Sequence, residues 1–162
     1  MSWAEILGDG FWNIPAERMK NKEPHRIPLC AMALEVIETA RLYSANSEYV
    51  FQSSFKKGFP ETVRALSKAI FRHFQEIGVT ERFTPHDLRR TMRTRLAELG
   101  EPDHIAERVL GHKLQGVMAI YNRHSYDTEK REALQKWETR LKEIIGTSTL
   151  ANVIPLRRRS HA

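Results

Sequence analysis

The chain has 162 residues, of which 41% are hydrophobic, so a single domain with one core is the expected organisation. Lysine and arginine outnumber aspartate and glutamate by 26 to 20, and the net charge of +6 favours a polyanionic partner, nucleic acid before an anionic membrane. The single cysteine, Cys30, excludes an intramolecular disulfide, and no apolar run approaches the ~18 residues of a membrane-spanning helix, so we expect a cytoplasmic protein.

The first part of the chain predicts a small antiparallel sheet. Trp3, Ile6 and Leu7 have no preceding element to pack against, so this end either docks on the fold or begins inside one. Segments 11–15 and 25–29 are rich in β-branched and aromatic residues and flank a polar, charged loop, which predicts a hairpin. The charges of that loop would otherwise be a solvated surface.

The middle of the chain is predicted to be helical with short interruptions. We expect helices over 31–43 and 61–77, the second with an apolar residue every three or four positions and Gly78 as its C-cap. Between these helices, 49–51 is expected to form a third short strand and 52–60 a turn region.

The rest of the chain begins at a strong helix start, with Thr84 as N-cap, Pro85 at the first helical position and Asp87 at the third. The segments expected to be helical are 84–99, 102–110, 115–122 and 127–145. The basic tail 146–162 lacks periodicity and is expected to be mobile. The predicted fold class is mainly α with a small antiparallel sheet near the N-terminus.

Four residues of this last part suggest phosphate chemistry. His86 and Arg89 lie three residues apart, which places them on one face near a helix N-terminus, where phosphate is attracted. An arginine can hold two phosphate oxygens, and His112, directly after Gly111, can donate to a third. Tyr121 follows nine residues later and could attack phosphorus if cations stabilise the charge that develops.

Each of these residues also has a structural interpretation. His86 could be a local capping group, the arginines could form a solvated face, and Tyr121 lies at helical spacing from Val117 and could belong to a core. The ordered set of His-x-x-Arg, Leu-Gly-His and a tyrosine nine residues further on favours phosphodiester chemistry over these separate interpretations.

This ordered set resembles the C-terminal catalytic domain of tyrosine recombinases, in particular phage-type integrases. The family's general-acid lysine lies in a hairpin, eight residues before the proline of a Pro-Leu pair. Here that pair is Pro28-Leu29, and the matching lysine is Lys20. The helix that contains Trp137 is also integrase-like, and the resemblance covers about residues 3–142.

The resemblance implies the fold of the DNA breaking–rejoining enzymes over residues 1–145, and a 3′-phosphotyrosyl intermediate formed without metal, ATP or other cofactor. It makes Tyr121 the nucleophile and Lys20 the acid that protonates the leaving oxygen. The residues that would stabilise the transition state are Arg89, His86 and His112, and the candidates for further DNA contacts are Arg90, Arg93, Arg95 and Lys113. The implied partner is a double-stranded DNA attachment site, on which the family assembles as a tetramer from free monomers.

Three points leave alternatives open. Tyr126 and Lys22 are rivals of Tyr121 and Lys20. The family has a further catalytic arginine just before the segment that matches Trp3, so the chain is expected to lack it together with the first helices of the domain, and to be impaired alone. A non-catalytic DNA-binding remnant or regulator, a type IB topoisomerase and a metal-dependent histidine nuclease are therefore the alternative functions.

Overall fold

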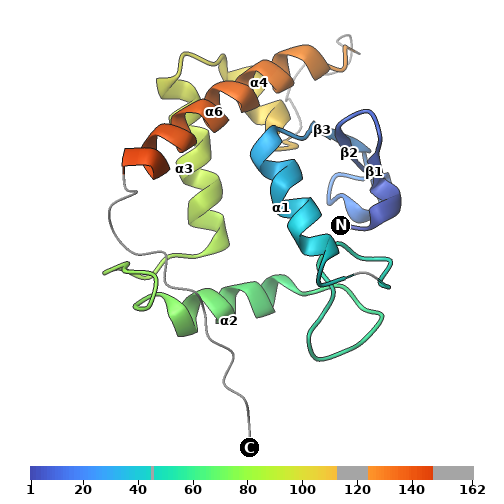
Figure 1. The fold of residues 1–162 in the computed structure, drawn as a ribbon. Helices are drawn as coiled ribbons and strands as arrows, with labels where there is room; N and C mark the ends of the chain where they lie inside the picture. The colour runs from blue at the N-terminus through green and yellow to red at the C-terminus, as the bar shows by residue number, and fades with distance from the viewer. Residues whose placement is uncertain (45, 113–123, 148–162) are drawn as a thin grey trace, which may run out of the picture.

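The structure, a computed structural model, describes residues 1–44, 46–112 and 124–147. A small sheet packs beside helices α1, α4 and α6, while α3 leads down to α2 at the base of the molecule (Figure 1). The strands are β1 (Ile6–Leu7), β2 (Phe11–Ile14) and β3 (His25–Pro28). The helices are α1 (Ala31–Arg41), α2 (Val63–His73), α3 (Pro85–Glu98), α4 (Asp103–Val109) and α6 (Asp127–Thr147), with 3₁₀ turns η1 (Trp3–Glu5) and η2 (Ala16–Arg18).

The predicted hairpin is confirmed, and the sheet is antiparallel in the order β1-β2-β3. Trp12 pairs with Ile27 across the hairpin, and Ile14 pairs with His25. The third strand predicted at 49–51 is wrong: β1 forms the third strand, and Tyr49 makes only an isolated bridge to Ser2. The apolar residues at 49–51 suggested a strand. Val50 is buried in a core without being part of a strand.

The larger core lies where α3, α4 and α6 meet. Its buried side chains are Leu96, Ile105, Ala106, Val109, Ala133 and Leu134. Ile105 and Val109 point inward as predicted, and Trp137 of α6 packs against the same cluster. The core therefore fixes α4, which ends directly before the Leu-Gly-His turn.

A second, smaller core joins the sheet to α1. Leu29, Ile37 and Val50 are buried there. Met1, Trp3, Ile6 and Trp12 pack against them, and the guanidinium of Arg41 lies 4.1 Å from the ring centroid of Trp3. The sequence left open whether the apolar residues at the start of the chain dock on the fold. Trp3 and Ile6 do so, because both pack against the smaller core.

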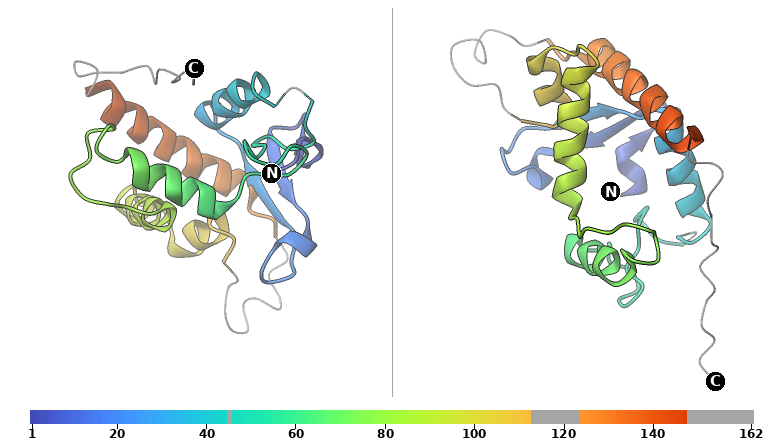
Figure 2. Two further views of the ribbon diagram at one scale, coloured as in Figure 1. Left: turned by 90° about the horizontal axis from the view of Figure 1, so that it is seen from below. Right: turned by 90° about the vertical axis from the view of Figure 1, so that its left-hand side faces the viewer.

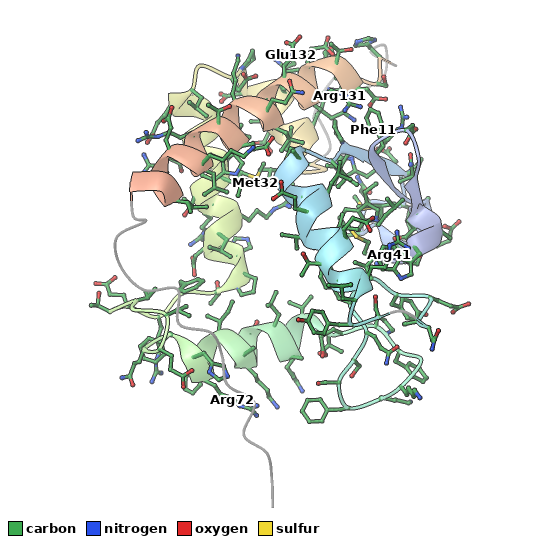
Figure 3. The ribbon with its side chains drawn as sticks, in the orientation of Figure 1. Phe11, Met32, Arg41, Arg72, Arg131 and Glu132 are labelled. Carbon is green, nitrogen blue, oxygen red and sulfur yellow. The ribbon has the colours of Figure 1, made fainter. Side chains whose placement is uncertain are left out.

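The sheet also contacts α6 directly. Phe11 of β2 is buried, and Arg131 of α6 places its guanidinium carbon 4.5 Å from the Phe11 ring centroid (Figure 3). Arg26 of β3 stacks on the same ring at 3.6 Å. These cations shield the aromatic ring from solvent, and they bring the strand that ends the hairpin next to the long helix.

Helix α2 differs most from the prediction. It is shorter than the expected 61–77, and its apolar stripe is not part of either core that the described residues form: Val63 is 76% exposed and Leu66 is 51% exposed. Figure 1 and the right-hand view of Figure 2 show α2 below α6 and the sheet and set apart from both. A period of three or four apolar residues predicts that a helix has an apolar face, but it does not specify what covers that face.

The other helices follow the prediction closely. Helix α1 ends two residues before Tyr43, and α6 continues to Thr147, two residues past the predicted 145. The predicted helix 115–122 and the tail 148–162 lie outside the described residues. In the described ranges, no helix combines the length and apolar character needed to cross a membrane.

Candidate functional site

The predicted capping box at the start of α3 is present. The hydroxyl of Thr84 accepts the N–H of Asp87, and the carboxylate of Asp87 accepts the N–H of Thr84 at 2.9 Å. Hydrogen bonds from Thr84 lower the pKa of Asp87, so this carboxyl is negatively charged at neutral pH. That negative charge opposes the attraction of phosphate that we expected at this helix end. An anion site on α3 would therefore depend on the positive groups further along the helix.

Arg89 and His112 are brought together. One Nη of Arg89 lies 3.1 Å from Nε2 of His112, and the same nitrogen donates to the carbonyl oxygen of Leu110. His86 lies one turn earlier on α3, is exposed, and makes no hydrogen bond to another described residue. The predicted pair on α3 is therefore arranged so that the arginine faces the Leu-Gly-His turn.

The Leu-Gly-His turn depends on Gly111. Gly111 has φ +70°, and the N–H of His112 donates to the carbonyl of Glu107 at 2.9 Å, the pattern of a Schellman C-cap. A Cβ on Gly111 would lie 3.0 Å from the ring of His25 and 3.3 Å from Cε of Met19. A glycine is needed here both for the left-handed backbone and for the close approach of the hairpin.

The hairpin that carries Lys20 contacts this turn through its neighbours. Met19 touches Gly111, and Nε2 of His25 lies 3.4 Å from the carbonyl oxygen of Val109. Lys20 itself is exposed in the loop. A hollow of about 240 Å³ separates the loop from the end of α4, and its lining includes Asn21, His25, Gly111, His112, His124 and Lys130. The hairpin loop and His112 therefore face the same small space.

Burial lowers the pKa of His25 below the usual histidine range, and the nearby positive charges of Lys130 and Arg89 act in the same direction. The contact with the Val109 carbonyl opposes this shift without reversing it. His25 is therefore neutral at pH 7, which suits a ring packed against a glycine backbone.

A chain of charged groups stands behind His112. Its Nδ1 contacts one carboxylate oxygen of Glu107, whose other oxygen accepts Nε–H of Arg93 at 2.7 Å. Arg93 also donates to Asp103 at 2.8 Å. Partial burial disfavours the charged form of Glu107, but the hydrogen bonds from Arg93 and His112 outweigh this effect and lower its pKa. The two carboxylates in turn raise the pKa of Arg93.

The predicted DNA-contacting arginines differ in their environment. The side chain of Arg90 is 74% exposed and 3.7 Å from Asp87, whereas that of Arg93 is 27% exposed and held between two carboxylates. Arg95 pairs with Glu98 at 2.6 Å on the surface. Arg90 is thus the most available of the three, and Lys113 lies outside the described residues.

The two candidate tyrosines cannot be compared directly, because Tyr121 lies outside the described residues. Tyr126 packs against the larger core with φ +54°. The rings of His104 and His124 meet it edge-on, with centroids 5.8 and 4.6 Å away, and Arg108 lies over it at 4.2 Å. These contacts give Tyr126 a packing role directly before α6.

Three residues of the site were not singled out from the sequence: Glu107, His25 and Arg108. Glu107 precedes His112 by five residues, a spacing that a Schellman turn brings together, so a carboxylate at this position was a usable signal. His25 and Arg108 act through contacts with distant segments, and no local pattern marks them.

The chain is similar to proteins of one known family. A profile of the phage integrase family matches residues 1–128. Prophage integrase IntA of Escherichia coli (strain K12) is 32% identical over 137 residues, which are 83% of this chain and 32% of the relative. Prophage integrase IntZ of the same strain is 33% identical over 142 residues, 86% of this chain and 34% of the relative.

Transposase B from transposon PsiTn554 of Staphylococcus aureus is 27% identical over 143 residues, 82% of this chain and 22% of the relative. The chain thus spans about a third of the length of the two prophage integrases that it matches. No solved structure matches it.

Proposed function

Since the chain belongs to the phage integrase family, we propose that it carries the DNA strand-cleaving centre of a site-specific recombinase. The observation that supports this most is the 3.1 Å approach of Arg89 on α3 and His112 in the turn after α4, two side chains that are able to bind phosphate. The hairpin with Lys20 lies against the same turn through Met19 and His25. A guanidinium in contact with an imidazole, with a lysine on the hairpin that packs against the same turn, suits a phosphodiester that is attacked and released.

In the proposed reaction, the phenol oxygen of Tyr121 forms a bond to phosphorus while the bond from phosphorus to the 5′ oxygen breaks. The phenol gives its proton to solvent water, and Lys20 gives a proton to the leaving 5′ oxygen. Arg89, His112 and His86 balance the extra negative charge of the phosphorane. The energy of the broken bond is kept in the 3′-phosphotyrosyl link, so rejoining needs no nucleotide cofactor.

The proposed partner is a double-stranded DNA attachment site, with several copies of the protein assembled on it. Surface arginines such as Arg90 would contact phosphates on either side of the cleaved bond, which positions the protein without reading sequence. The net charge of +6 supports this partner.

The second candidate is a non-catalytic DNA-binding member of the family. It is favoured by one observation: the guanidinium of Arg89 is bonded to the protein's own Leu110 carbonyl and to His112. An arginine that is satisfied internally has to exchange these partners before it can hold a phosphate.

A nicked suicide substrate separates the two candidates. Cleavage of such a duplex releases a short strand and traps the covalent protein–DNA adduct, which is detected as a shifted band on a denaturing gel. We expect an adduct with the unmodified chain and with Tyr126→Phe, and none with Tyr121→Phe. Loss of the adduct in Tyr126→Phe alone would make Tyr126 the nucleophile. DNA binding with no adduct in any variant, also when a longer chain supplies the family's further catalytic arginine, would support the non-catalytic candidate.

A further inference from the structure

His112 is held by Glu107 in two ways. The main-chain carbonyl of Glu107 accepts the N–H of His112 at 2.9 Å, and its carboxylate contacts Nδ1 of the imidazole. The carboxylate is fixed in turn by Arg93, whose other nitrogen is anchored on Asp103. The imidazole therefore has a defined orientation, with Nδ1 toward α4 and Nε2 toward Arg89 on α3.

The hydrogen-bonding partners determine which nitrogen carries the proton. An ionised carboxylate only accepts, so Nδ1 of His112 has to be the donor toward Glu107. A guanidinium only donates, so Nε2 has to present its lone pair to Arg89. Only the neutral imidazole with its proton on Nδ1 satisfies both contacts.

We infer that Glu107, supported by Arg93, is a positioning residue that fixes this tautomer, and that His112 gains a second proton, on Nε2, when a DNA phosphate enters the site. The second part rests on the proposed function. A phosphate oxygen only accepts hydrogen bonds, so an imidazole with a lone pair on Nε2 repels it. Once Arg89 turns to the phosphate, Nε2 can take a proton from solvent and donate, while the negative charge of Glu107 balances the imidazolium.

Other charged groups also surround the imidazole and contribute to its protonation. Arg89 faces it from α3 and Glu107 from α4. Those that share the hollow with it are Glu23, His25 and Arg26 from the hairpin, Arg108 from α4, His124 from the segment before α6, and Asp127 and Lys130 from the first turn of α6. Among them Glu107 alone contacts the ring nitrogen that points away from the phosphate position, so its effect can be isolated by substitution.

The tautomer can be observed without any enzymatic activity. Long-range ¹H–¹⁵N spectra of the histidine rings distinguish a protonated from an unprotonated ring nitrogen. In the unmodified chain at pH 7 we expect His112 with a protonated Nδ1 and an unprotonated Nε2. Glu107→Gln keeps the main-chain contact but replaces a carboxylate oxygen with an amide, so the fixed Nδ1–H signal should be lost.

Asp103→Asn is the matched control, because Asp103 contacts Arg93 but not His112, and the Nδ1–H signal should remain. The positioning role is overturned if the unmodified chain has its proton on Nε2, or if Glu107→Gln leaves the signal unchanged. Thermal unfolding of each variant shows whether a lost signal reflects a lost fold, in which case Glu107→Met, which also removes the carboxylate and is of similar length, replaces Glu107→Gln with the same expected loss of signal.

Proton uptake is tested by adding duplex DNA to the Tyr121→Phe chain. In the proposed reaction this variant cannot cleave the DNA, so the duplex stays intact. We expect both ring nitrogens of His112 to become protonated on binding, and Glu107→Gln to prevent this. Bound DNA with a singly protonated His112 overturns the uptake. Failure to bind DNA contradicts the proposed function instead, and the tautomer result still decides the positioning role.

Discussion

The ammonium group of Lys130 donates to the main-chain carbonyl oxygen of Arg26 at 2.6 Å, and this contact fastens the first turn of α6 to β3. Lys130 is 4% exposed and also lies 2.9 Å from Asp127. The Lys130 and Arg26 charges outweigh the effect of burial and lower the pKa of Asp127. The hairpin is therefore held against the helical half by the buried ammonium group of Lys130 and by the ion pair between Arg26 and Asp127, as well as by packing.

Replacing Lys130 by methionine should destabilise the fold. The change leaves the carbonyl of Arg26 without this donor and Asp127 with one cation fewer, which costs roughly 2–4 kcal/mol in comparable buried pairs. Urea denaturation followed by circular dichroism measures the effect. Lys142→Met on the same helix is the control, because that side chain is 55% exposed, and its midpoint should stay almost unchanged. Equal losses in both variants would contradict the role of Lys130.

The turn before His112 should not tolerate a side chain. Gly111→Ala combines a φ of +70° with contacts to His25 at 3.0 Å and Met19 at 3.3 Å, and we expect it to cost about 2–3 kcal/mol. Gly100→Ala has the same kind of backbone at φ +80° but nothing within 4 Å, so it measures the conformational part alone, about 1 kcal/mol. Equal losses at the two glycines would show that the hairpin does not press on this turn.

Two leucines of α3 test where the core lies. Leu96 is fully buried among α4 and α6, and Leu96→Ala should lower the free energy of unfolding by about 2–5 kcal/mol. Leu88→Ala, two turns earlier, removes the same atoms from a side chain that is 56% exposed, and should change it by less than about 1 kcal/mol. A larger loss at Leu88 would place it in a core that the described residues do not form.

His25 should make stability depend on pH in the mildly acidic range. Its pKa in the folded chain is lowered from 6.5, so the unfolded chain binds a proton first. Its contribution is complete above pH 6.5 and is lost as pH falls below 6.5 toward the lower folded pKa, with a slope of at most about 1.4 kcal/mol per pH unit. Denaturation between pH 7 and 5 should show this slope, and His25→Phe should reduce it. His73→Phe, on the exposed end of α2, should leave it in place.

Arg90 and Arg93 should affect DNA binding differently. Arg90→Ala removes an exposed charge, and we expect the slope of log K against log salt to decrease in magnitude by about 0.9. Arg93→Ala should leave this slope unchanged, because its charge is neutralised by Glu107 and Asp103. Fluorescence anisotropy of a labelled duplex at several salt concentrations provides the comparison. A change of slope at Arg93 and none at Arg90 would reverse the assignment.

Local signals made much of this fold predictable. The Thr84–Asp87 capping box and Gly111 marked helix ends, and the β-branched and aromatic residues of 11–15 and 25–29 on either side of a polar loop marked the hairpin. By contrast, β1 has two residues, too few to show any alternation. The apolar stripe of α2 predicted a helix correctly but not its environment, since burial depends on elements far away in sequence.

The site divides in the same way. His86, Arg89 and His112 could be predicted as candidates because their order matches a family pattern, and the fold brings two of them, Arg89 and His112, into contact. His25 could not be identified, because its importance comes from contacts with Gly111 and Val109, 84 residues further along in the second case. Such contacts exist only once the chain has closed on itself, so a single sequence contains no periodic trace of them.

The contact between His25 and the Gly111 turn also sets an order of events during synthesis. The hairpin leaves the ribosome 84 residues before Val109 does, which at the usual elongation rates of about 5–20 residues per second is a delay on the order of ten seconds. During that interval Met19 and His25 lack the Gly111 turn against which they pack in the folded chain, and the loop with Lys20 is not positioned by it. In a nascent chain the Leu-Gly-His turn and the hairpin therefore meet only after the helical half has emerged.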